Sequence, residues 1–208
     1  MDIVIAGAGA LGRVTCDFVS SCGHRVLAFI DDSGQFTGKT VNGFPVYLPE
    51  RIDELLEQDP VFSIAILDGK GRESMGERIL QRNGKFIELR MEGSFISPFA
   101  TIGQGCSLFP HAYVMNNVVM GNYCHVHMFT VIGHDVAVGD YCAFTPQCVI
   151  GGGSQIGRGV SFGMGASVVP NTKIGDYCVI GAGAIVTRDV PAHSVVFGAP
   201  SKIMKRRA

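Results

Sequence analysis

The chain has 208 residues, a net charge of −1 at pH 7 and only 17% charged residues. No basic block is present, which argues against a nucleic-acid-binding surface, and no apolar run approaches the roughly 18 residues that would cross a bilayer. The first residues lack the basic flank of a signal peptide, so the seven cysteines predict reduced thiols in the cytoplasm.

The first ninety residues alternate apolar runs with amphipathic segments, in the order typical of a small parallel sheet. We expect helices over about residues 10–21 and 73–82, and strands at 3–6, 25–30, 63–67 and 85–89. This alternation predicts an α/β domain of Rossmann-like type. We place it at residues 1–90.

The loop after the first strand has the spacing of a phosphate-binding turn. Gly7, Gly9 and Gly12 follow a strand and precede a helix, where a phosphate can approach the backbone at the helix N-terminus. The second strand ends in Asp31 and Asp32, an acidic pair placed to hold a ribose. A tight turn with no ligand is the alternative. Ninety residues are too few for both halves of a dinucleotide site, which favours a single nucleotide diphosphate.

From residue 96 to residue 186, every sixth residue is large and apolar. The residue two positions earlier is small or β-branched from Ala100 onward. Two inward positions in every six describe one flat side of a triangular coil, and three sides make a coil of 18 residues. This is the signature of a left-handed parallel β-helix built from hexapeptide repeats. We assign residues 91–208 to it, with a C-terminal end segment from Pro191, where the register is lost.

Two columns of residues repeat with the longer period of 18. Five glycines mark one corner and predict a backbone angle that a Cβ would oppose: Gly103, Gly121, Gly139, Gly157 and Gly175. Four cysteines share a small inward position: Cys106, Cys124, Cys142 and Cys178. Buried thiols pack as small hydrophobic groups, so we expect neither a disulfide nor a metal site among them.

His134 is the candidate catalytic residue within the hexapeptide repeats. It lies two residues from an inward position on either side, so it should occupy a corner and face outward. A histidine there is suited to proton transfer near neutral pH, and Asp135 beside it would raise its basicity. A surface histidine without a role is the alternative. His125 and His127 lie on another side of the coil, so their spacing does not predict a metal site.

Taken together, these motifs resemble the family of sugar acetyltransferases that includes UDP-4-amino-sugar (bacillosamine-type) N-acetyltransferases, perosamine N-acetyltransferases and sialic acid O-acetyltransferases. The resemblance covers nearly the whole chain. It rests on residues 5–9, 29–32, 38–45, 132–135, the hexapeptide run and 196–202.

The resemblance implies an acetyl-CoA-dependent N-acetyltransferase that modifies the amino group of a nucleotide-linked amino sugar. It also implies a homotrimer that uses no metal. O-acetylation of a sialic acid or another sugar hydroxyl is one alternative, and a non-catalytic β-helix scaffold that binds a nucleotide is another. The acceptor sugar and its nucleotide stay open.

The same resemblance assigns roles to individual residues. It implies that His134 is the general base and that Asp135 supports it. Nucleotide and sugar contacts would come from Gly9, Ala10, Leu11, Asp31, Asp32, Asp68 and His127. Coenzyme contacts would come from Ala143, Met164 and Ala182, and a backbone N–H near Gly152 would hold the oxyanion.

Overall fold

The computed structural model of the protein describes residues 1–206, and the chain divides into two compact units. One unit comprises Met1–Leu67 and Gly71–Glu88, and the other comprises Asp68–Lys70 and the chain from Leu89 onward. Each unit has its own hydrophobic core.

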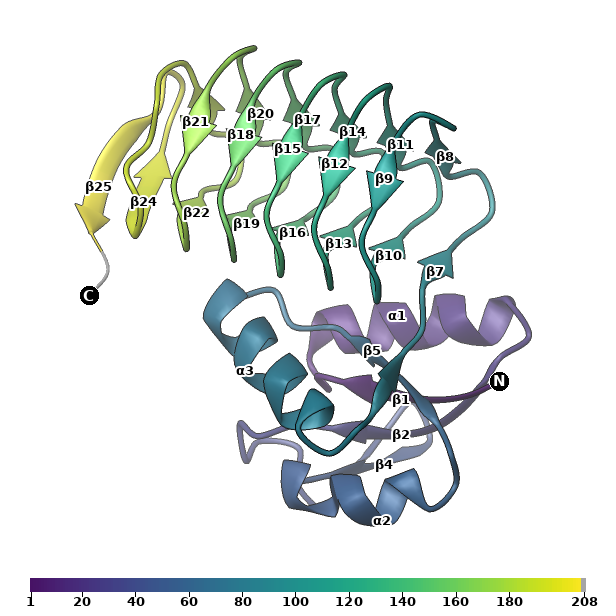
Figure 1. The fold of residues 1–208 in the computed structure, drawn as a ribbon. Helices are drawn as coiled ribbons and strands as arrows, with labels where there is room; N and C mark the ends of the chain where they lie inside the picture. Colours follow the sequence, from purple (N-terminus) through teal and green to yellow (C-terminus); the bar gives the residue numbers. More distant parts are fainter. Residues whose placement is uncertain (207–208) are drawn as a thin grey trace. The chain divides into compact units, whose positions relative to one another are not determined.

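The first unit is a six-stranded sheet with the strand order β3-β4-β2-β1-β5-β6 (Figure 1). All neighbouring strands run parallel except β3 and β4. Its elements are β1 (Asp2–Ala6), α1 (Ala10–Ser21), β2 (Arg25–Ile30), β3 (Thr40–Val41), β4 (Phe44–Tyr47), the 3₁₀ helix η1 (Pro49–Arg51), α2 (Ile52–Leu56), β5 (Val61–Ile64), α3 (Gly69–Leu80) and β6 (Lys85–Phe86).

The central strand β1 explains why this sheet forms. Its residues Ile3–Ala6 are all fully buried, which is typical of a parallel strand covered on both faces. The Rossmann-like prediction is therefore confirmed. Across residues 1–206, no helix combines the length and the apolar character needed to cross a membrane.

Several local details differ from the sequence prediction. The helix predicted at about 73–82 begins earlier, at Gly69, and the short helix α2 was not predicted. The β3–β4 hairpin was not predicted, although Asn42 and Gly43 form a two-residue turn with positive φ values of 48° and 82°. An Asn-Gly pair between two short apolar runs is the usual signal of such a turn. The strand predicted at 85–89 ends at Phe86, because Leu89 pairs within the β-helix instead. The predicted strand at 63–67 lies earlier, at β5.

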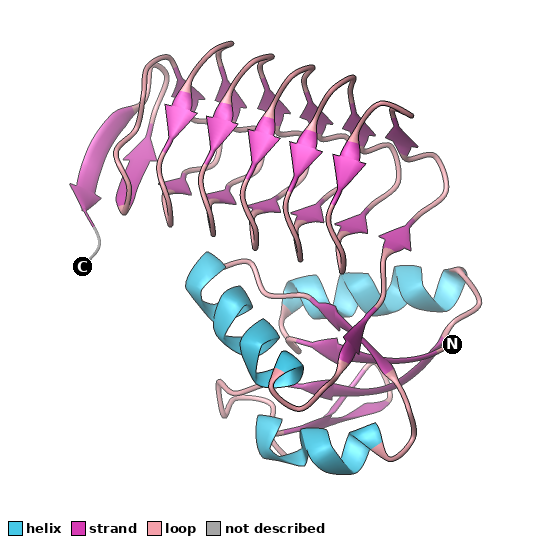
Figure 2. Ribbon diagram, viewed as in Figure 1, coloured by secondary structure: helices cyan, strands magenta, loops and turns pink. Residues whose placement is uncertain are grey.

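The second unit is a left-handed parallel β-helix in which each coil adds one two-residue strand to each of three sheets (Figures 1 and 2). The first sheet contains β7 (Leu89–Arg90), β10 (Ser107–Leu108), β13 (His125–Val126), β16 (Ala143–Phe144), β19 (Ser161–Phe162) and β22 (Val179–Ile180). The second contains β8 (Phe95–Ile96), β11 (Tyr113–Val114), β14 (Val131–Ile132), β17 (Val149–Ile150), β20 (Ser167–Val168) and β23 (Ile185–Val186). The third contains β9 (Thr101–Ile102), β12 (Val119–Met120), β15 (Ala137–Val138), β18 (Gln155–Ile156) and β21 (Lys173–Ile174).

The strand pairs from β7 to β23 join residues 18 positions apart, such as Ser107 and His125. The unbroken six-residue register is therefore confirmed. After β23, β24 (Ser194–Phe197) pairs parallel with β22 and antiparallel with β25 (Lys202–Arg206). This hairpin forms the predicted end segment and covers the edge of the first sheet, which would otherwise present unpaired backbone groups.

The predicted cysteine column is buried, and its four cysteines form no disulfide. Each thiol lies within hydrogen-bonding reach of a corner carbonyl in the next coil, as Cys142 Sγ does at 3.0 Å from the Gly157 oxygen. Burial raises the pKa of Cys124 well above its ordinary value and that of Cys148 to about 11. Thr130 in the same kind of position donates to the Thr145 carbonyl at 3.0 Å. Where a cysteine or threonine occupies the small inward position, its side chain can therefore donate to a corner carbonyl of the next coil.

The glycine column is real, but the reason predicted for it was wrong. None of its five members has a positive φ. Instead, a Cβ added to Gly139 would lie 2.7 Å from the backbone nitrogen of Arg158 in the next coil. The left-handed residues of this corner come two positions later, at Tyr123, Tyr141 and Tyr177, with φ values of 52–58°. Close approach of neighbouring coils, and not a backbone angle, therefore requires glycine in this column.

Replacing Gly139 by alanine should destabilise the β-helix by about 1–3 kcal/mol, because the added methyl group overlaps the backbone of the next coil. Urea unfolding followed by circular dichroism measures the change. Gly165→Asn is the control, since no atom lies within 4 Å of an added Cβ and asparagine tolerates the φ of 69°. Equal losses in the two variants would contradict the steric explanation.

Candidate functional site

His134 and Asp135 form the corner between β14 and β15. The chain turns there because Asp135 adopts a left-handed backbone conformation with φ 58°, which short polar side chains tolerate better than most others. Neighbours in a strand point to opposite faces, but this turn brings the two side chains together. Both remain exposed, at 66% for His134 and 55% for Asp135. The predicted outward corner position of His134 is confirmed.

The two side chains are joined by a hydrogen bond of 2.7 Å between His134 Nδ1 and Asp135 Oδ2. An ionised carboxylate can only accept, so Nδ1 carries the proton and Nε2 keeps a lone pair. The hydrogen bond from His134, and then that from Asn117, hold the pKa of Asp135 below its ordinary value. The pair therefore leaves Nε2 as the ring atom that accepts a proton when the imidazole is neutral.

Gly152 lies one coil after His134 and leaves room for the imidazole ring. A Cβ added to Gly152 would lie 2.5 Å from Nε2 and 2.6 Å from Cε1 of His134. Any side chain at this position would therefore displace the ring. The N–H of Gly153 donates to the carbonyl of His134 at 2.9 Å, which holds the two corners in register.

His127, which the resemblance placed near the acceptor, does not lie at this corner. Its side chain is 6% exposed, and its ring stacks on Phe109 with centroids 4.5 Å apart. Its Nδ1 accepts the N–H of Met128 at 2.9 Å, and burial lowers its pKa. His127 is thus a neutral ring packed within the structure, and its neighbour His125 is also buried.

The residues expected to contact the coenzyme lie in different surroundings. Ala143 is fully buried in β16, and its N–H donates to the carbonyl of Val160 at 2.9 Å. Met164 and Ala182 each begin a corner on another edge of the β-helix, in successive coils, and both are exposed. Of these three residues, Met164 and Ala182 have side chains that a ligand can reach, whereas Ala143 could contribute only through its backbone.

The predicted phosphate loop joins β1 to α1 at the carboxyl edge of the first unit's sheet. A Cβ added to Gly7 or Gly12 would meet neighbouring backbone atoms, whereas nothing lies within 4 Å of one added to Gly9. Gly9 is also the N-cap of α1, without a side-chain cap. Ala10 and Leu11, the first residues of the helix, are at least partly exposed. Gly9 therefore leaves an open approach to the helix N-terminus.

The two acidic residues after β2, Asp31 and Asp32, lie in different environments. Asp31 accepts the N–H of Ala8 at 2.8 Å through one carboxylate oxygen and the N–H of Ser33 at 2.9 Å through the other. Asp31 therefore ties the glycine loop to the end of β2. Asp32 is exposed and forms a long ion pair with Arg78, at 3.5 Å.

A cavity of about 650 Å³ is lined by the end of the β2–β3 loop, by residues of β3 and β4, and by the chain that follows β4. Its lining includes Lys39, Tyr47 and Arg51, with the Arg51 guanidinium 5.1 Å from the centre of the Tyr47 ring. Loops at the carboxyl ends of parallel strands are where such sheets bind ligands.

Asp68, another predicted nucleotide contact, is exposed just before α3, and its contacts group it with the second unit. Among residues 1–206, no group of three or more His, Cys, Asp or Glu side chains is arranged to hold a metal ion.

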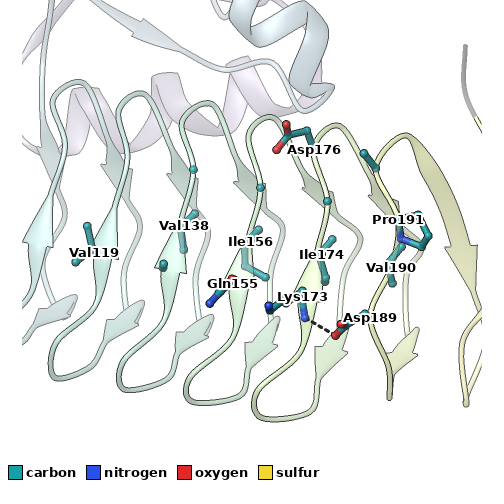
Figure 3. A pocket seen from close by; sticks show the side chains of 15 residues that line it. Val119, Val138, Gln155, Ile156, Lys173, Ile174, Asp176, Asp189, Val190 and Pro191 are labelled. Atoms are coloured by element: carbon teal, nitrogen blue, oxygen red, sulfur yellow. Dashed lines mark hydrogen bonds between the residues drawn. The ribbon is translucent and has the colours of Figure 1, made fainter.

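A groove of about 700 Å³ runs along the third sheet of the β-helix (Figure 3). Its wall includes the outward residues of four successive coils: Val119, Ala137, Gln155 and Lys173. At one end, Asp189 accepts the backbone N–H of Lys173 at 2.8 Å, and Asp176 lies on the same lining. The charged side chains of the lining, Lys173, Asp176 and Asp189, lie towards that end, and Val119 and Ala137 make the other end of the wall apolar.

Two known families cover most of the chain. Residues 2–79 match the family described as the PglD N-terminal domain. Residues 99–134, 117–152 and 153–188 match the bacterial transferase hexapeptide family, described as six repeats. A GDP-perosamine N-acetyltransferase from Escherichia coli O157:H7 is 32% identical over 201 residues, which cover 94% of this chain and 82% of that protein.

Solved structures that contain both units support the same family assignment. PerB from Caulobacter crescentus, in complex with CoA and GDP-perosamine, has a TM-score of 0.89 at 26% identity, over 99% of this chain and 98% of that one. The acetyltransferase domain of PglB from Neisseria gonorrhoeae, in complex with acetyl coenzyme A, has a TM-score of 0.86 at 25% identity, over 98% of each chain.

The Rossmann-like unit and the β-helix, together with the two matching families, define a hexapeptide-repeat acyltransferase. The chain belongs to the sugar N-acetyltransferase family, and it is an acetyl-CoA-dependent enzyme.

Burial of His127 predicts a specific dependence of stability on pH. A histidine with a lowered pKa is neutral when folded and takes up a proton on unfolding once the pH falls below its ordinary value of about 6.5. The contribution to stability is therefore full above about pH 6.5 and declines as the pH falls towards the lowered folded value.

The free energy of unfolding in urea, compared at about pH 7.5 and pH 5.5, tests this. The unmodified protein should lose more stability between these conditions than His127→Gln, whose side chain does not titrate. The same loss in both proteins would show that His127 is protonated equally in the folded and unfolded states.

Proposed function

We propose that the protein transfers the acetyl group of acetyl-CoA to the amino group of a nucleotide-linked amino sugar, with His134 as the general base. The observation that carries the proposal is the exposed His134–Asp135 pair, which leaves Nε2 as the accepting atom at a corner. Similarity to a GDP-perosamine N-acetyltransferase, and to a structure in complex with CoA and GDP-perosamine, supports this class of acceptor.

The transfer needs no covalent enzyme intermediate. The amine nitrogen attacks the thioester carbonyl carbon while His134 Nε2 takes a proton from that nitrogen. The tetrahedral intermediate then collapses, the carbon–sulfur bond breaks, and the leaving sulfur receives the proton from the imidazolium. The products are the N-acetylated sugar and free CoA. Asp135 stabilises the imidazolium, and holding the two substrates together supplies much of the rate.

We assign the oxyanion contact to the backbone N–H of Gly152. The N–H groups of Gly151 and Gly153 donate to carbonyls of neighbouring coils and are not available. A Cβ added to Gly133 would lie 2.9 Å from the nitrogen of Gly152, so the glycine at 133 leaves that nitrogen uncovered. A preorganised backbone donor beside the base is the arrangement that acyl transfer requires.

We assign nucleotide binding to the first unit. The open face of Gly9 and the uncapped start of α1 fit a diphosphate, because helix N-termini favour anions. Asp32 is the better candidate for the ribose hydroxyls, since Asp31 already accepts hydrogen bonds through both oxygens to shape the loop. The cavity beside Lys39 and Tyr47 has room for further parts of the nucleotide.

We further propose that the protein is a homotrimer, in which acetyl-CoA lies between adjacent β-helices. The outward residues Phe95, Tyr113, Val149 and Ile185 of the second sheet are 42–50% exposed in the single chain. An exposed apolar strip of this kind is typical of an interface. Light scattering should give roughly 66 kDa, three times the 22.2 kDa of one chain. A monomer at micromolar concentration would contradict this assembly.

The decisive experiment for the proposed function assays acetyl transfer from acetyl-CoA to UDP-, GDP- and dTDP-linked amino sugars and to free sialic acids. We expect transfer to an amine of a nucleotide-linked sugar, with a product resistant to mild base, as amides are and esters are not. His134→Ala should lower kcat by roughly 10²–10⁴-fold with little change in KM for the sugar nucleotide. Asp135→Asn should have a smaller effect.

Transfer only to sialic acid hydroxyls would replace the proposed acceptor by the O-acetylation alternative. Near-normal kcat in His134→Ala with the true acceptor would exclude His134 as the base. Lack of transfer with the whole panel would count against the amino-sugar acceptor itself.

A further inference from the structure

The carboxylate of Asp135 is held at both of its oxygens. Oδ2 accepts from His134 Nδ1 at 2.7 Å, and Oδ1 accepts from Asn117 Nδ2 at 3.0 Å. Asn117 lies 18 residues before Asp135, at the same corner of the preceding coil. The backbone N–H of Asp135 also donates to the Asn116 carbonyl at 2.9 Å, so the two corners stack directly.

We propose that Asn117 is a positioning residue of the catalytic site, which fixes the Asp135 carboxylate so that His134 keeps its proton on Nδ1 and its lone pair on Nε2. This rests on the proposed function of His134. Asn117 acts through Asp135 and touches no reacting atom. Both Asp135 and His134 are exposed, so a carboxylate held at one oxygen only would rotate into water and release the ring.

The backbone of the corner does not need an asparagine side chain. Asn117, Asp135, Gly153 and Asn171 occupy the same position in four successive coils, and all have left-handed φ values of 57–70°. Gly153 shows that this position folds without any side chain. Of the four, Asn117 is the residue placed to donate to Asp135, whereas the amide of Asn171 lies beside Gly153, which has no carboxylate. The turn therefore accepts an asparagine or a glycine, and the feature that sets Asn117 apart from Asn171 is its hydrogen bond to the Asp135 carboxylate.

The test compares three variants in the full-length protein. Asn117→Gly removes the side chain without straining the left-handed backbone. Asn117→Asp keeps the size and tolerates the same φ, but replaces the donor by an acceptor that faces Asp135. Asn171→Gly is the matched control, with the same backbone conformation and the same change one coil beyond Gly153.

We expect Asn117→Gly to lower kcat roughly tenfold, within the range that outer partners of an oriented histidine contribute, with KM for both substrates within about twofold. Asn117→Asp should be at least as impaired, because two acceptors then face each other. Asn171→Gly should keep kcat within about twofold of the unmodified protein. Unchanged kcat in Asn117→Gly, or an equal loss in Asn171→Gly, would overturn the assignment.

A second readout needs no substrate and therefore separates this inference from the proposed reaction. The ¹⁵N NMR signals of labelled histidines report which ring nitrogen carries the proton, and His134→Ala identifies the signal of His134. The unmodified protein should show His134 protonated on Nδ1, and Asn117→Gly should show a mixture of the two tautomers. An unchanged tautomer in Asn117→Gly would overturn the inference, even in a protein whose acetyltransferase activity is established.

The carboxylate itself gives an independent check. The hydrogen bond from Asn117 contributes to the lowered pKa of Asp135, so the pKa measured by ¹³C NMR should move upward in Asn117→Gly and stay in place in Asn171→Gly. Failure of the transfer assay in the unmodified protein, with these two NMR results as expected, would reject the proposed function while keeping the structural role of Asn117.

Discussion

The parallel hydrogen-bond ladder between coils is the interaction on which the β-helix and its site depend. It joins residues 18 positions apart, and it brings coils so close that a Cβ added at Gly139 would meet the next backbone. Because the register does not slip, whatever occupies a corner lies directly against the corners of the coils before and after it. The corner residues can therefore form contacts that are remote in sequence but repeat with the period of the coil.

The candidate site uses this stacking in both directions. Asp135 receives a hydrogen bond from Asn117 in the preceding coil, and the ring of His134 occupies the space that Gly152 leaves open in the following coil. Three consecutive coils thus fix one imidazole that is nevertheless exposed to solvent. A base held in this way needs little reorganisation during proton transfer, since its orientation is set by the fold and not by the substrate.

Environment also decides which histidine is suited to this chemistry. His127 is only seven residues from His134, yet it packs against Phe109, and burial holds it in the neutral form. In the first unit, Asp31 and Asp32 are adjacent, but one shapes the glycine loop and the other is left exposed. In both cases, residues of the same type acquire different roles from the backbone position that they occupy.

The sequence by itself determined the architecture of both units. Two inward positions in every six residues predict a triangular coil, because that structure buries all of them. The alternation of strands and helices in the first ninety residues predicts a parallel sheet. It also placed His134 at an outward corner and the cysteines inside.

It did not determine why the glycine column exists, since a requirement for close coil approach and one for an unusual backbone angle select the same residue. Only the tertiary structure decided that Asn117 holds Asp135, that Gly152 makes room for the imidazole and that Asp31 ties the loop at Ala8. Those contacts join residues 18 to 23 positions apart, and side-chain direction at a corner follows from φ values that no local pattern of apolar residues encodes.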